Sequence, residues 1–395
     1  MAIVSKLEIE TSRPPPRDMR VPARPSELGA EWLTACLRKA GVLGAGEHVS
    51  GFECEHIGEG RGFAGQIARV AVRYEPAVAG APATLIAKFA TDHERTQEMM
   101  RSLDDYAREV RFYRELAPEI GLGTPRCYFA HYDPGTRKFC LLLEDLAPAE
   151  SVDRDQGYSL EQAQQVLEQL AAMHARHWNR VEHLDWLQVD DALFSNLREA
   201  FMKGLPALRE RYRTQYPTLV RVAEQFAVFF EGDELLTEAR RPPLTLAHHD
   251  IHVDNIFLPS ARGGRFALID WQSVSVSRLG TNDVARLLCM GMRPEQRRQH
   301  TPALLRHYHR ALCAHGVRDY SLRSLRLRYR QELIAVVLIT VIVLDQVDFG
   351  QDAASQFAAR IDAALVDARA ARLLAVLGLW LRVRRWVKRL FGRGQ

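Results

Sequence analysis

The chain has 395 residues, of which 47% are hydrophobic and 26% are charged. These fractions are typical of a folded globular protein and exclude a wholly disordered, collagen-like or multi-span membrane chain. The net charge is +4, but residues 366–395 alone carry +7, which leaves −3 for residues 1–365. The body of the chain therefore lacks the excess of positive charge that nucleic-acid binding requires, and we expect no nucleic-acid partner.

The cysteines and the N-terminus indicate a cytoplasmic protein. Six cysteines are scattered along the chain without a C-x-x-C pair, which favours reduced thiols over disulfides or a metal site. Residues 1–25 lack the apolar stretch of a secretory signal, and we interpret them as a mobile leader.

Residues 26–146 are predicted to form a small, mostly antiparallel lobe with one important helix. The segment Gln66–Tyr74 alternates apolar and polar residues, as a half-buried strand does. Further strands are expected over 84–89, 126–132 and 138–143, and helices over 28–42 and 104–116.

Residues 147–365 are predicted to form a larger, helical lobe, so that the fold class is α+β. Helices are expected over 160–179, 193–212, 219–230, 302–315 and 328–346, with one island of strand and loop over 244–270. The apolar run 333–344 has only 12 residues, too few to cross a bilayer, and is expected to be a buried helix.

The island contains the residues best suited to chemistry, His248-His-Asp-Ile-His-Val-Asp-Asn255. Asp250 can accept a proton from a hydroxyl, while Asn255 and Asp270 offer the hard oxygen ligands that Mg²⁺ prefers. A hairpin between Asn255 and Asp270 would bring those two ligands together, as phosphoryl transfer requires. Two alternatives are a transition-metal site, because His248, Asp250 and His252 alternate, and a plain solvated loop.

Three glycines, Gly60, Gly62 and Gly65, form a G-x-G-x-x-G pattern. An alternating strand follows them, whereas a dinucleotide-binding fold would continue with a helix. The pattern suits a glycine-rich flap over nucleotide phosphates, and the alternative is a flexible turn.

Lys88 is a single lysine in the apolar strand 84–89. A buried lysine needs an anionic partner, and Glu109 in the helix 104–116 is the candidate. Such a pair would orient Lys88 toward nucleotide phosphates. The alternative is an exposed lysine on an edge strand.

These features follow one another in an order that resembles the aminoglycoside phosphotransferase and choline kinase superfamily, over roughly residues 49–344. Within it, the Leu-Glu-Asp-Leu segment 143–146 and the helix Leu170–Trp178 look most like the ecdysteroid-kinase-like (CHK kinase-like) branch. The resemblance implies a protein-kinase-like fold of two lobes, residues 26–146 and 147–365.

The resemblance also implies roles for the loop residues. Asp250 would be the catalytic base, with His248 in the same catalytic set, and Asn255 and Asp270 would hold Mg²⁺. Asp283 would be an aspartate at a helix start that steadies the catalytic loop. A plain acidic residue favoured by the helix dipole is the alternative for Asp283.

For the nucleotide, the resemblance implies a site in the small lobe. Lys88, braced by Glu109, would hold the α- and β-phosphates under the flap of Gly60, Gly62 and Gly65. The backbone near Glu144 to Leu146 would receive the adenine. This chain departs from the family at His249, where glycine is frequent, and at Trp271-Gln272, where Phe-Gly is frequent.

The implied activity is transfer of the γ-phosphate of ATP, with Mg²⁺, to a hydroxyl of a small metabolite or xenobiotic. One alternative is an aminoglycoside O-phosphotransferase, and another is a nucleotide-binding pseudokinase or scaffold. The stretch 196–221 is rich in arginine, which argues against a polycationic acceptor unless those arginines only face solvent.

The C-terminal segment 366–395 is predicted to be a basic amphipathic helix. At 100° per residue, eight apolar residues fall in one arc of about 140°: Val376, Leu379, Trp380, Val383, Trp386, Val387, Leu390 and Phe391. The helix can dock on the large lobe or lie on the inner face of a membrane. Residues 360–376 look continuous with the body of the chain, which favours docking.

Overall fold

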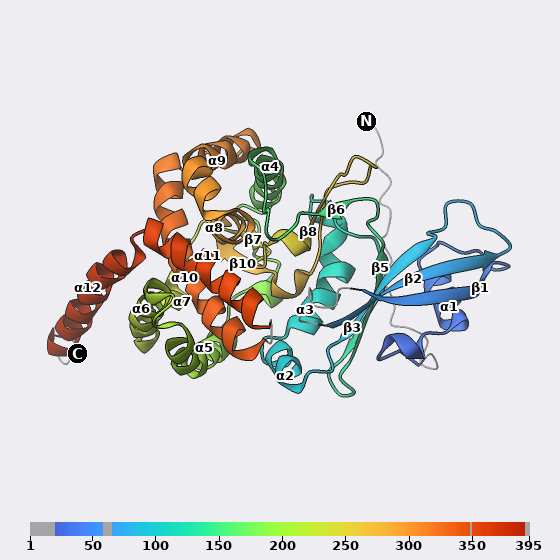
Figure 1. The fold of residues 1–395 in the computed structure, drawn as a ribbon, viewed down its shortest axis with the longest axis horizontal. Coiled ribbons are helices and arrows are strands. Elements are labelled where there is room, and N and C mark those ends of the chain that lie inside the picture. The colour runs from blue at the N-terminus through green and yellow to red at the C-terminus, as the bar shows by residue number, and fades with distance from the viewer. Residues whose placement is uncertain (1–19, 58–64, 348–349, 392–395) are drawn as a thin grey trace. The chain divides into compact units, whose positions relative to one another are not determined.

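The computed structural model describes residues 20–57, 65–347 and 350–391 (Figure 1). The chain forms two compact units. The first comprises the described part of Met1–Gln97 together with Asp104–Ile120 and Thr124–Asp145; the second comprises Glu98–Leu103, Gly121–Gly123 and the described part of Leu146–Gln395. The first holds a sheet and the second is mainly helical, which confirms the predicted α+β class.

The first unit is built on an antiparallel sheet, which has five strands within the described residues, in the order β1-β2-β3-β5-β4. The strands are β1 (His48–Ile57), β2 (Gly65–Glu75), β3 (Thr84–Ala90), β4 (Cys127–Asp133) and β5 (Lys138–Glu144). The strand β3 is hydrogen-bonded on both sides, so Lys88 is on an inner strand and the edge-strand alternative is wrong.

Strand alternation assigns the two faces of this sheet to different helices. Leu85, Ala87 and Phe89 are buried in one hydrophobic cluster with residues of α1 (Ala30–Lys39). Successive side chains of a strand point to opposite faces, so Lys88 lies on the other face. That face is where Glu109 of α3 (Asp105–Arg111) meets it.

The N-terminal segment differs from the prediction. Residues 1–19 of the expected leader lie outside the described residues, but Val21 is buried in the cluster against α1. Its carbonyl also accepts a hydrogen bond from Lys138 Nζ. Residues 21–25 therefore belong to the folded unit, because an apolar side chain here completes the core.

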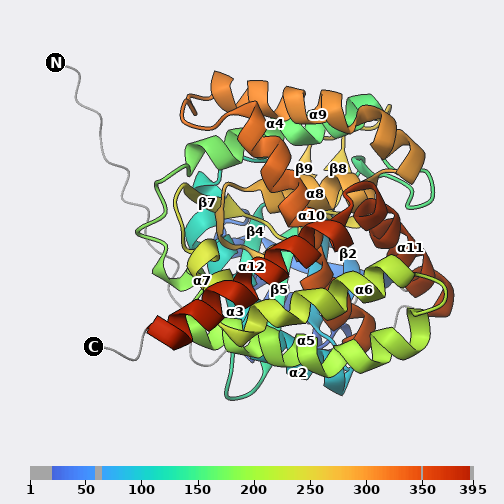
Figure 2. The same cartoon turned by 90° about the vertical axis from the view of Figure 1, so that its left-hand side faces the viewer.

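Helices form most of the second unit (Figure 2). They are α4 (Leu160–Arg176), α5 (Asp191–Tyr212), α6 (Pro217–Phe226), α7 (Glu234–Ala239), α8 (Thr281–Gly291), α9 (Pro294–Ala314), α10 (Leu322–Gln346), α11 (Gln351–Asp367) and α12 (Ala370–Phe391). The apolar run 333–344 lies in α10 and is largely buried, as predicted. In the described part of the chain, no helix has the length and hydropathy that crossing a bilayer requires.

Short strands position the polar loop of the second unit. The strand β7 (Leu244–Ala247) pairs with β10 (Ser275–Arg278). The strand β8 (Ile256–Leu258) pairs with β6 (Glu150–Ser151) and with β9 (Ala267–Leu268). The loop 248–255 joins β7 to β8, and Asp270 follows β9, so the predicted hairpin is confirmed.

Element ends deviate most from the predictions. The helix expected over 104–116 starts at Asp105, because Asp104 is left-handed, and finishes as a π-helical turn, Phe112–Leu116. The helix α2 (Glu94–Ser102) was not predicted.

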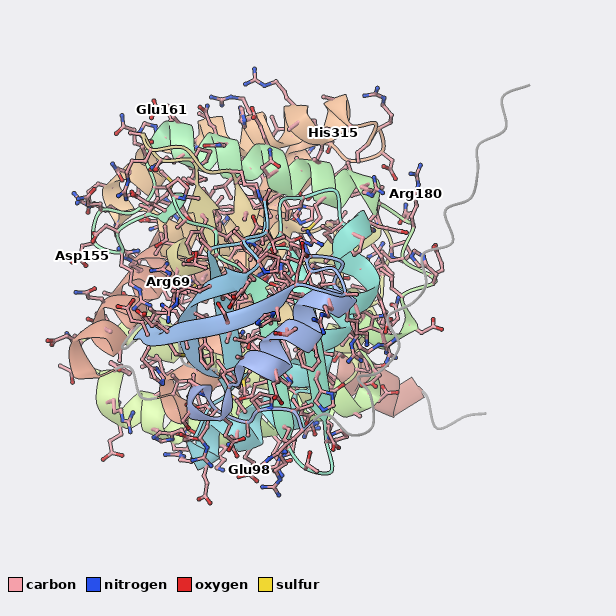
Figure 3. All side chains as sticks on the ribbon, turned by 90° about the vertical axis from the view of Figure 1, so that its right-hand side faces the viewer. Arg69, Glu98, Asp155, Glu161, Arg180 and His315 are labelled. Atoms are coloured by element: carbon pink, nitrogen blue, oxygen red, sulfur yellow. The ribbon has the colours of Figure 1, made fainter. Side chains whose placement is uncertain are left out.

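Charged side chains such as Glu98, Glu161 and Arg180 are exposed (Figure 3). No disulfide occurs within the described residues.

Candidate active site

The first unit contains a buried ion pair. Lys88 Nζ lies 2.9 Å from both Glu109 carboxylate oxygens, and both side chains are buried. The bidentate contact holds the lysine in one orientation, which confirms the pairing predicted from the sequence. Removing either partner would leave a buried, uncompensated charge, a change that typically costs about 3–5 kcal/mol.

The glycine pattern is described only at its last position. Gly60 and Gly62 lie outside the described residues, while Gly65 begins β2. A Cβ atom at Gly65 would stand 2.2 Å from the carbonyl oxygen of Phe89. Glycine is therefore required at the start of β2, because any side chain there would push β2 and β3 apart.

The segment Glu144–Leu146 lies where the chain passes from the first unit to the second. Glu144 ends β5, and its carboxylate accepts the backbone N–H of Arg126 at 2.8 Å. Arg69 pairs with the Asp145 carboxylate at 2.7 Å. The Leu146 carbonyl accepts from Ala149, whereas its N–H donates to no described residue.

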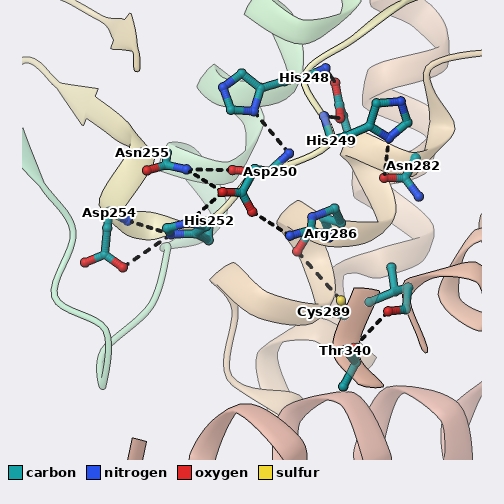
Figure 4. Close-up of polar contacts among 12 residues, drawn as sticks. His248, His249, Asp250, His252, Asp254, Asn255, Asn282, Arg286, Cys289 and Thr340 are labelled. Atoms are coloured by element: carbon teal, nitrogen blue, oxygen red, sulfur yellow. Dashed lines mark hydrogen bonds and ion pairs between the residues drawn. The ribbon is translucent and has the colours of Figure 1, made fainter. Parts of the chain in front are cut away.

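The second unit holds the Asp250 carboxylate by both oxygens (Figure 4). Oδ1 lies 2.6 Å from Nη2 of Arg286, and Oδ2 accepts from Asn255 Nδ2 at 3.2 Å. Asn255 Nδ2 also donates to the Asp250 carbonyl at 2.9 Å. These contacts fix the rotamer of Asp250, which is the requirement for a group that must orient a reacting hydroxyl.

Asn255 and Asp270 are brought together by the β8–β9 pairing. The N–H of Ile269 donates to the Asn255 carbonyl at 2.9 Å, so Asp270 follows directly on that contact. Because the Asn255 amide nitrogen is used on Asp250, its oxygen is the end available to a cation. An amide oxygen and a carboxylate are the donors that Mg²⁺ prefers, and the residues thus fit this ion.

His248 links these two parts of the site. Its Nε2 donates to the Ile269 carbonyl at 2.9 Å, and its Nδ1 accepts the Asp250 N–H at 3.1 Å. Both nitrogens of His248 are occupied by these backbone contacts, which leaves neither of them for a metal ion. In the described part of the chain, no cluster of three histidine, cysteine or acidic side chains fits a metal ion.

Asp283 anchors the backbone of the loop. It is completely buried in the first turn of α8, and its carboxylate accepts the N–H groups of His248 and His249 at 2.9 and 2.8 Å. His174 of α4 lies 3.2 Å from the same carboxylate and 2.7 Å from the Tyr308 hydroxyl. These contacts favour the loop-steadying interpretation of Asp283 over that of a plain helix-start acid.

Two departures from the family pattern have a structural explanation. His249 has φ 65°, a conformation in which glycine is least strained, and its Nδ1 lies 3.2 Å from Asn282 Oδ1. Trp271 is buried, donates from its indole nitrogen to the Leu268 carbonyl at 2.9 Å, and packs against the His248 ring. With both residues in place, Asp250 makes its contacts with Arg286 and Asn255.

Sequence reasoning missed Arg286, although a signal was present. Arg286 follows Asp283 by three residues in α8, so the two side chains share a helix face. Once Asp283 is placed under the loop, a buried cation one turn later is expected to reach the same loop. The guanidinium of Arg286 does so, and its side chain is buried.

The charges around Asp250 determine its protonation state. Burial alone would raise the pKa of Asp250, but His252, Arg286 and His248 outweigh it and hold that pKa far below its usual range. Burial likewise opposes protonation of His252. The carboxylates of Asp250 and Asp254 outweigh that effect and raise the pKa of His252 to about 9. At neutral pH the site therefore contains an ionised Asp250 beside a protonated His252.

This raised pKa predicts a pH-dependent stability. A group whose pKa rises on folding stabilises the protein fully below its ordinary pKa of 6.5, and the contribution is lost as the pH rises through 9. We expect the unfolding free energy of the wild type to fall by up to about 3 kcal/mol over this window relative to His252→Gln. Urea denaturation between these pH values measures the difference.

The control is His315→Gln, because His315 is exposed on the same unit (Figure 3). The His315→Gln curve is expected to run parallel to that of the wild type. Parallel curves for the wild type and His252→Gln would instead contradict the coupling of His252 to Asp250.

Comparison with known proteins shows the family of the chain. The profile of the ecdysteroid kinase-like family matches residues 59–318, more than half of the chain. An uncharacterized kinase-like protein of Caenorhabditis elegans is 27% identical over 231 residues, which are 56% of this chain and 60% of that protein. The similarity thus spans less than two thirds of that relative.

Solved structures were compared as well, and one of them shows the fold. A "putative aminoglycoside phosphotransferase" of Ralstonia eutropha is 11% identical, with a TM-score of 0.50 over 87% of this chain and 98% of that one. An ethanolamine kinase of Plasmodium vivax is 13% identical, with a TM-score of 0.45 over 80% and 81%. The first likeness confirms the predicted fold and, at this identity, says nothing of the substrate.

Proposed function

Because the chain belongs to the ecdysteroid kinase-like family, we propose that it is a small-molecule kinase that transfers the γ-phosphate of ATP to a hydroxyl group. The observation that supports this most is the carboxylate of Asp250. It is held by Arg286 on one oxygen and by Asn255 on the other. Asp270 follows Ile269, whose N–H donates to the Asn255 carbonyl. A fixed carboxylate beside two metal ligands is what a kinase catalytic loop supplies.

In this proposal Asp250 orients the acceptor hydroxyl and receives its proton. The lowered pKa of Asp250 keeps it ionised, so one lone pair can always accept from the hydroxyl. Such a weak base removes the proton late, when the bond from oxygen to phosphorus is already forming. Arg286 and Asn255 hold the carboxylate in position during that step.

Asn255 Oδ1 and the Asp270 carboxylate would hold Mg²⁺. When bound, the ion neutralises charge on the β- and γ-phosphates. His248 positions these ligands relative to Asp250, because it bonds to the backbone at Asp250 and at Ile269. The role of His248 is therefore positioning, in place of the catalytic role expected from the sequence.

Residues between Gly60 and Leu146 would bind the nucleotide. Lys88, oriented by Glu109, suits the α- and β-phosphates as a buried cation. The Leu146 N–H, which donates to no described residue, suits a ring nitrogen of adenine. Gly65 permits the start of β2 to lie close to β3, and the roles of Gly60 and Gly62 rest on the sequence pattern.

The proposed acceptor is a small alcohol, and the stretch 196–221 does not select its charge. The cations of the stretch 196–221, which argued against a polycation, are all exposed: Arg198, Lys203, Arg209, Arg211, Arg213 and Arg221. They face solvent, so they no longer argue against an aminoglycoside. An acceptor panel must therefore include polycationic as well as neutral and anionic alcohols.

Label transfer from γ-labelled ATP tests the proposal. We expect the wild type to produce a phosphatase-sensitive phosphomonoester with at least one alcohol of that panel, and Asp250→Asn to produce none. Phosphorylation of kanamycin-type compounds would assign the aminoglycoside activity. Tight nucleotide binding without transfer to any alcohol of the panel would contradict the kinase proposal and favour the scaffold.

A further inference from the structure

The last helix, α12, has two dissimilar faces. Ala370, Leu374 and Gly378, spaced four residues apart, are buried where α12 runs beside α6 (Figure 2). On a different face, Val376, Leu379 and Trp380 are 67%, 62% and 56% exposed. They are three of the six large hydrophobic residues that are exposed among the residues whose burial is described, which end at Trp380. The face that docks is therefore not the apolar arc predicted from the sequence.

The sequence continues both faces to the end of the helix, which extends past the neighbouring helices (Figure 1). At 100° per residue, the arc that contains Val376, Leu379 and Trp380 runs on through five further apolar positions: Val383, Trp386, Val387, Leu390 and Phe391. The positions in line with the docked face become basic: Arg385, Lys388 and Arg389. The sequence of the second half of α12 therefore predicts an apolar face and a cationic face.

Charge and hydrophobicity together select the partner. The chain has eight basic residues and no acidic residue after Asp367. A nucleic acid would match the cations but leave the apolar arc in water. A second copy of α12 would cover the arc but bring two cationic faces together. An anionic bilayer matches both, because its interface takes apolar and tryptophan side chains while its headgroups attract arginine and lysine.

We propose that α12 is an interfacial anchor that lies on an anionic lipid surface. The arc from Val376 to Phe391 enters the boundary between headgroups and acyl chains, and the basic residues contact the headgroups. The docked start of the helix, Ala370 to Gly378, ties the anchor to the second unit. This inference is independent of the proposed kinase activity, since neither the contact nor its readout involves nucleotide.

Co-sedimentation of the full chain with lipid vesicles tests the anchor. We expect binding to phosphatidylcholine vesicles that contain about 30% phosphatidylserine, weak binding to phosphatidylcholine alone, and weakening by salt. The variant Val376→Ser/Leu379→Ser/Trp380→Ser should lower the partition coefficient at least about tenfold. Its matched control removes the other three exposed large hydrophobic residues, Met202→Ser/Leu327→Ser/Val366→Ser, and should bind like the wild type.

The cationic face has its own matched pair. Arg385→Gln/Lys388→Gln/Arg389→Gln should lose the preference for phosphatidylserine, whereas Lys203→Gln/Arg213→Gln/Arg221→Gln removes the same charge from exposed positions and should keep it. Three results would overturn the anchor: no binding of the wild type to anionic vesicles, equal binding of the arc variant, or an arc-dependent dimer in lipid-free solution. Tighter binding to single-stranded RNA than to vesicles would also overturn it.

Discussion

Replacing Asp250 by Asn is expected to lower kcat for phosphoryl transfer by about 10³-fold or more, with little change in nucleotide affinity. The amide keeps the shape of the side chain but cannot take the proton of the acceptor hydroxyl. It also places an uncharged group against Arg286, which lies 2.6 Å from the native carboxylate. Steady-state kinetics with the acceptor found by label transfer, together with calorimetry of ATP binding, separates the two effects.

A suitable control is Asp367→Asn in the same unit. Asp367 is 27% exposed and lies 2.6 Å from the buried Arg297, whereas Asp250 is 22% exposed and lies 2.6 Å from the buried Arg286. Both substitutions thus remove one carboxylate from one buried arginine. Wild-type turnover in Asp367→Asn, combined with loss of turnover in Asp250→Asn, assigns the effect to chemistry. Appreciable turnover in Asp250→Asn would contradict its role.

Replacing Asp283 by Asn is expected to be the most damaging substitution that does not touch a reactant. The native carboxylate accepts the N–H groups of His248 and His249, and burial raises its pKa less than His174, His249 and His248 lower it, to about 2. The amide of Asn presents one oxygen and one NH₂ group in place of two oxygens. One of the two loop N–H groups, of His248 or His249, would then face another donor and lose its acceptor. We expect a loss of about 3 kcal/mol in unfolding free energy, and a fall in kcat of about 10²-fold.

Tyr308→Phe is the graded control for this network. It removes the 2.7 Å contact of the hydroxyl with His174 but leaves Asp283 and the loop intact, so a loss of about 1 kcal/mol is expected. Hydrogen exchange at the N–H groups of His248 and His249 provides a readout of positioning. Faster exchange in Asp283→Asn than in Tyr308→Phe supports the anchor role. Equal exchange rates in both variants would contradict it.

Local patterns predicted the parts of the fold that depend on neighbours in sequence. The alternation in 66–74 placed β2, and a lone lysine among apolar residues placed Lys88 on an inner strand facing an acid. The hairpin between Asn255 and Asp270 was predictable as well, because two short apolar segments close together in sequence pair most readily with each other.

Contacts between distant segments were beyond sequence reasoning. His174 and Asp283 are 109 residues apart, and nothing local to either shows that α4 and α8 meet at the catalytic loop. The docked face of α12 could not be predicted either. Its buried residues Ala370, Leu374 and Gly378 include only one large apolar side chain, whereas the other face has eight apolar residues. The arginines of 196–221 could be assigned to solvent only once their exposure was known.

The central claim is that Asn255 and Asp270 bind Mg²⁺-ATP, and the thermal shift of the wild type and Asp270→Ala tests it most directly. Ligand that binds only the folded state raises its stability by RT ln(1 + [L]/Kd), about 2.7 kcal/mol at a hundredfold excess over Kd. We predict a shift in the wild type that requires both Mg²⁺ and ATP and is lost in Asp270→Ala. No shift in the wild type, or the same shift in Asp270→Ala, would contradict the claim.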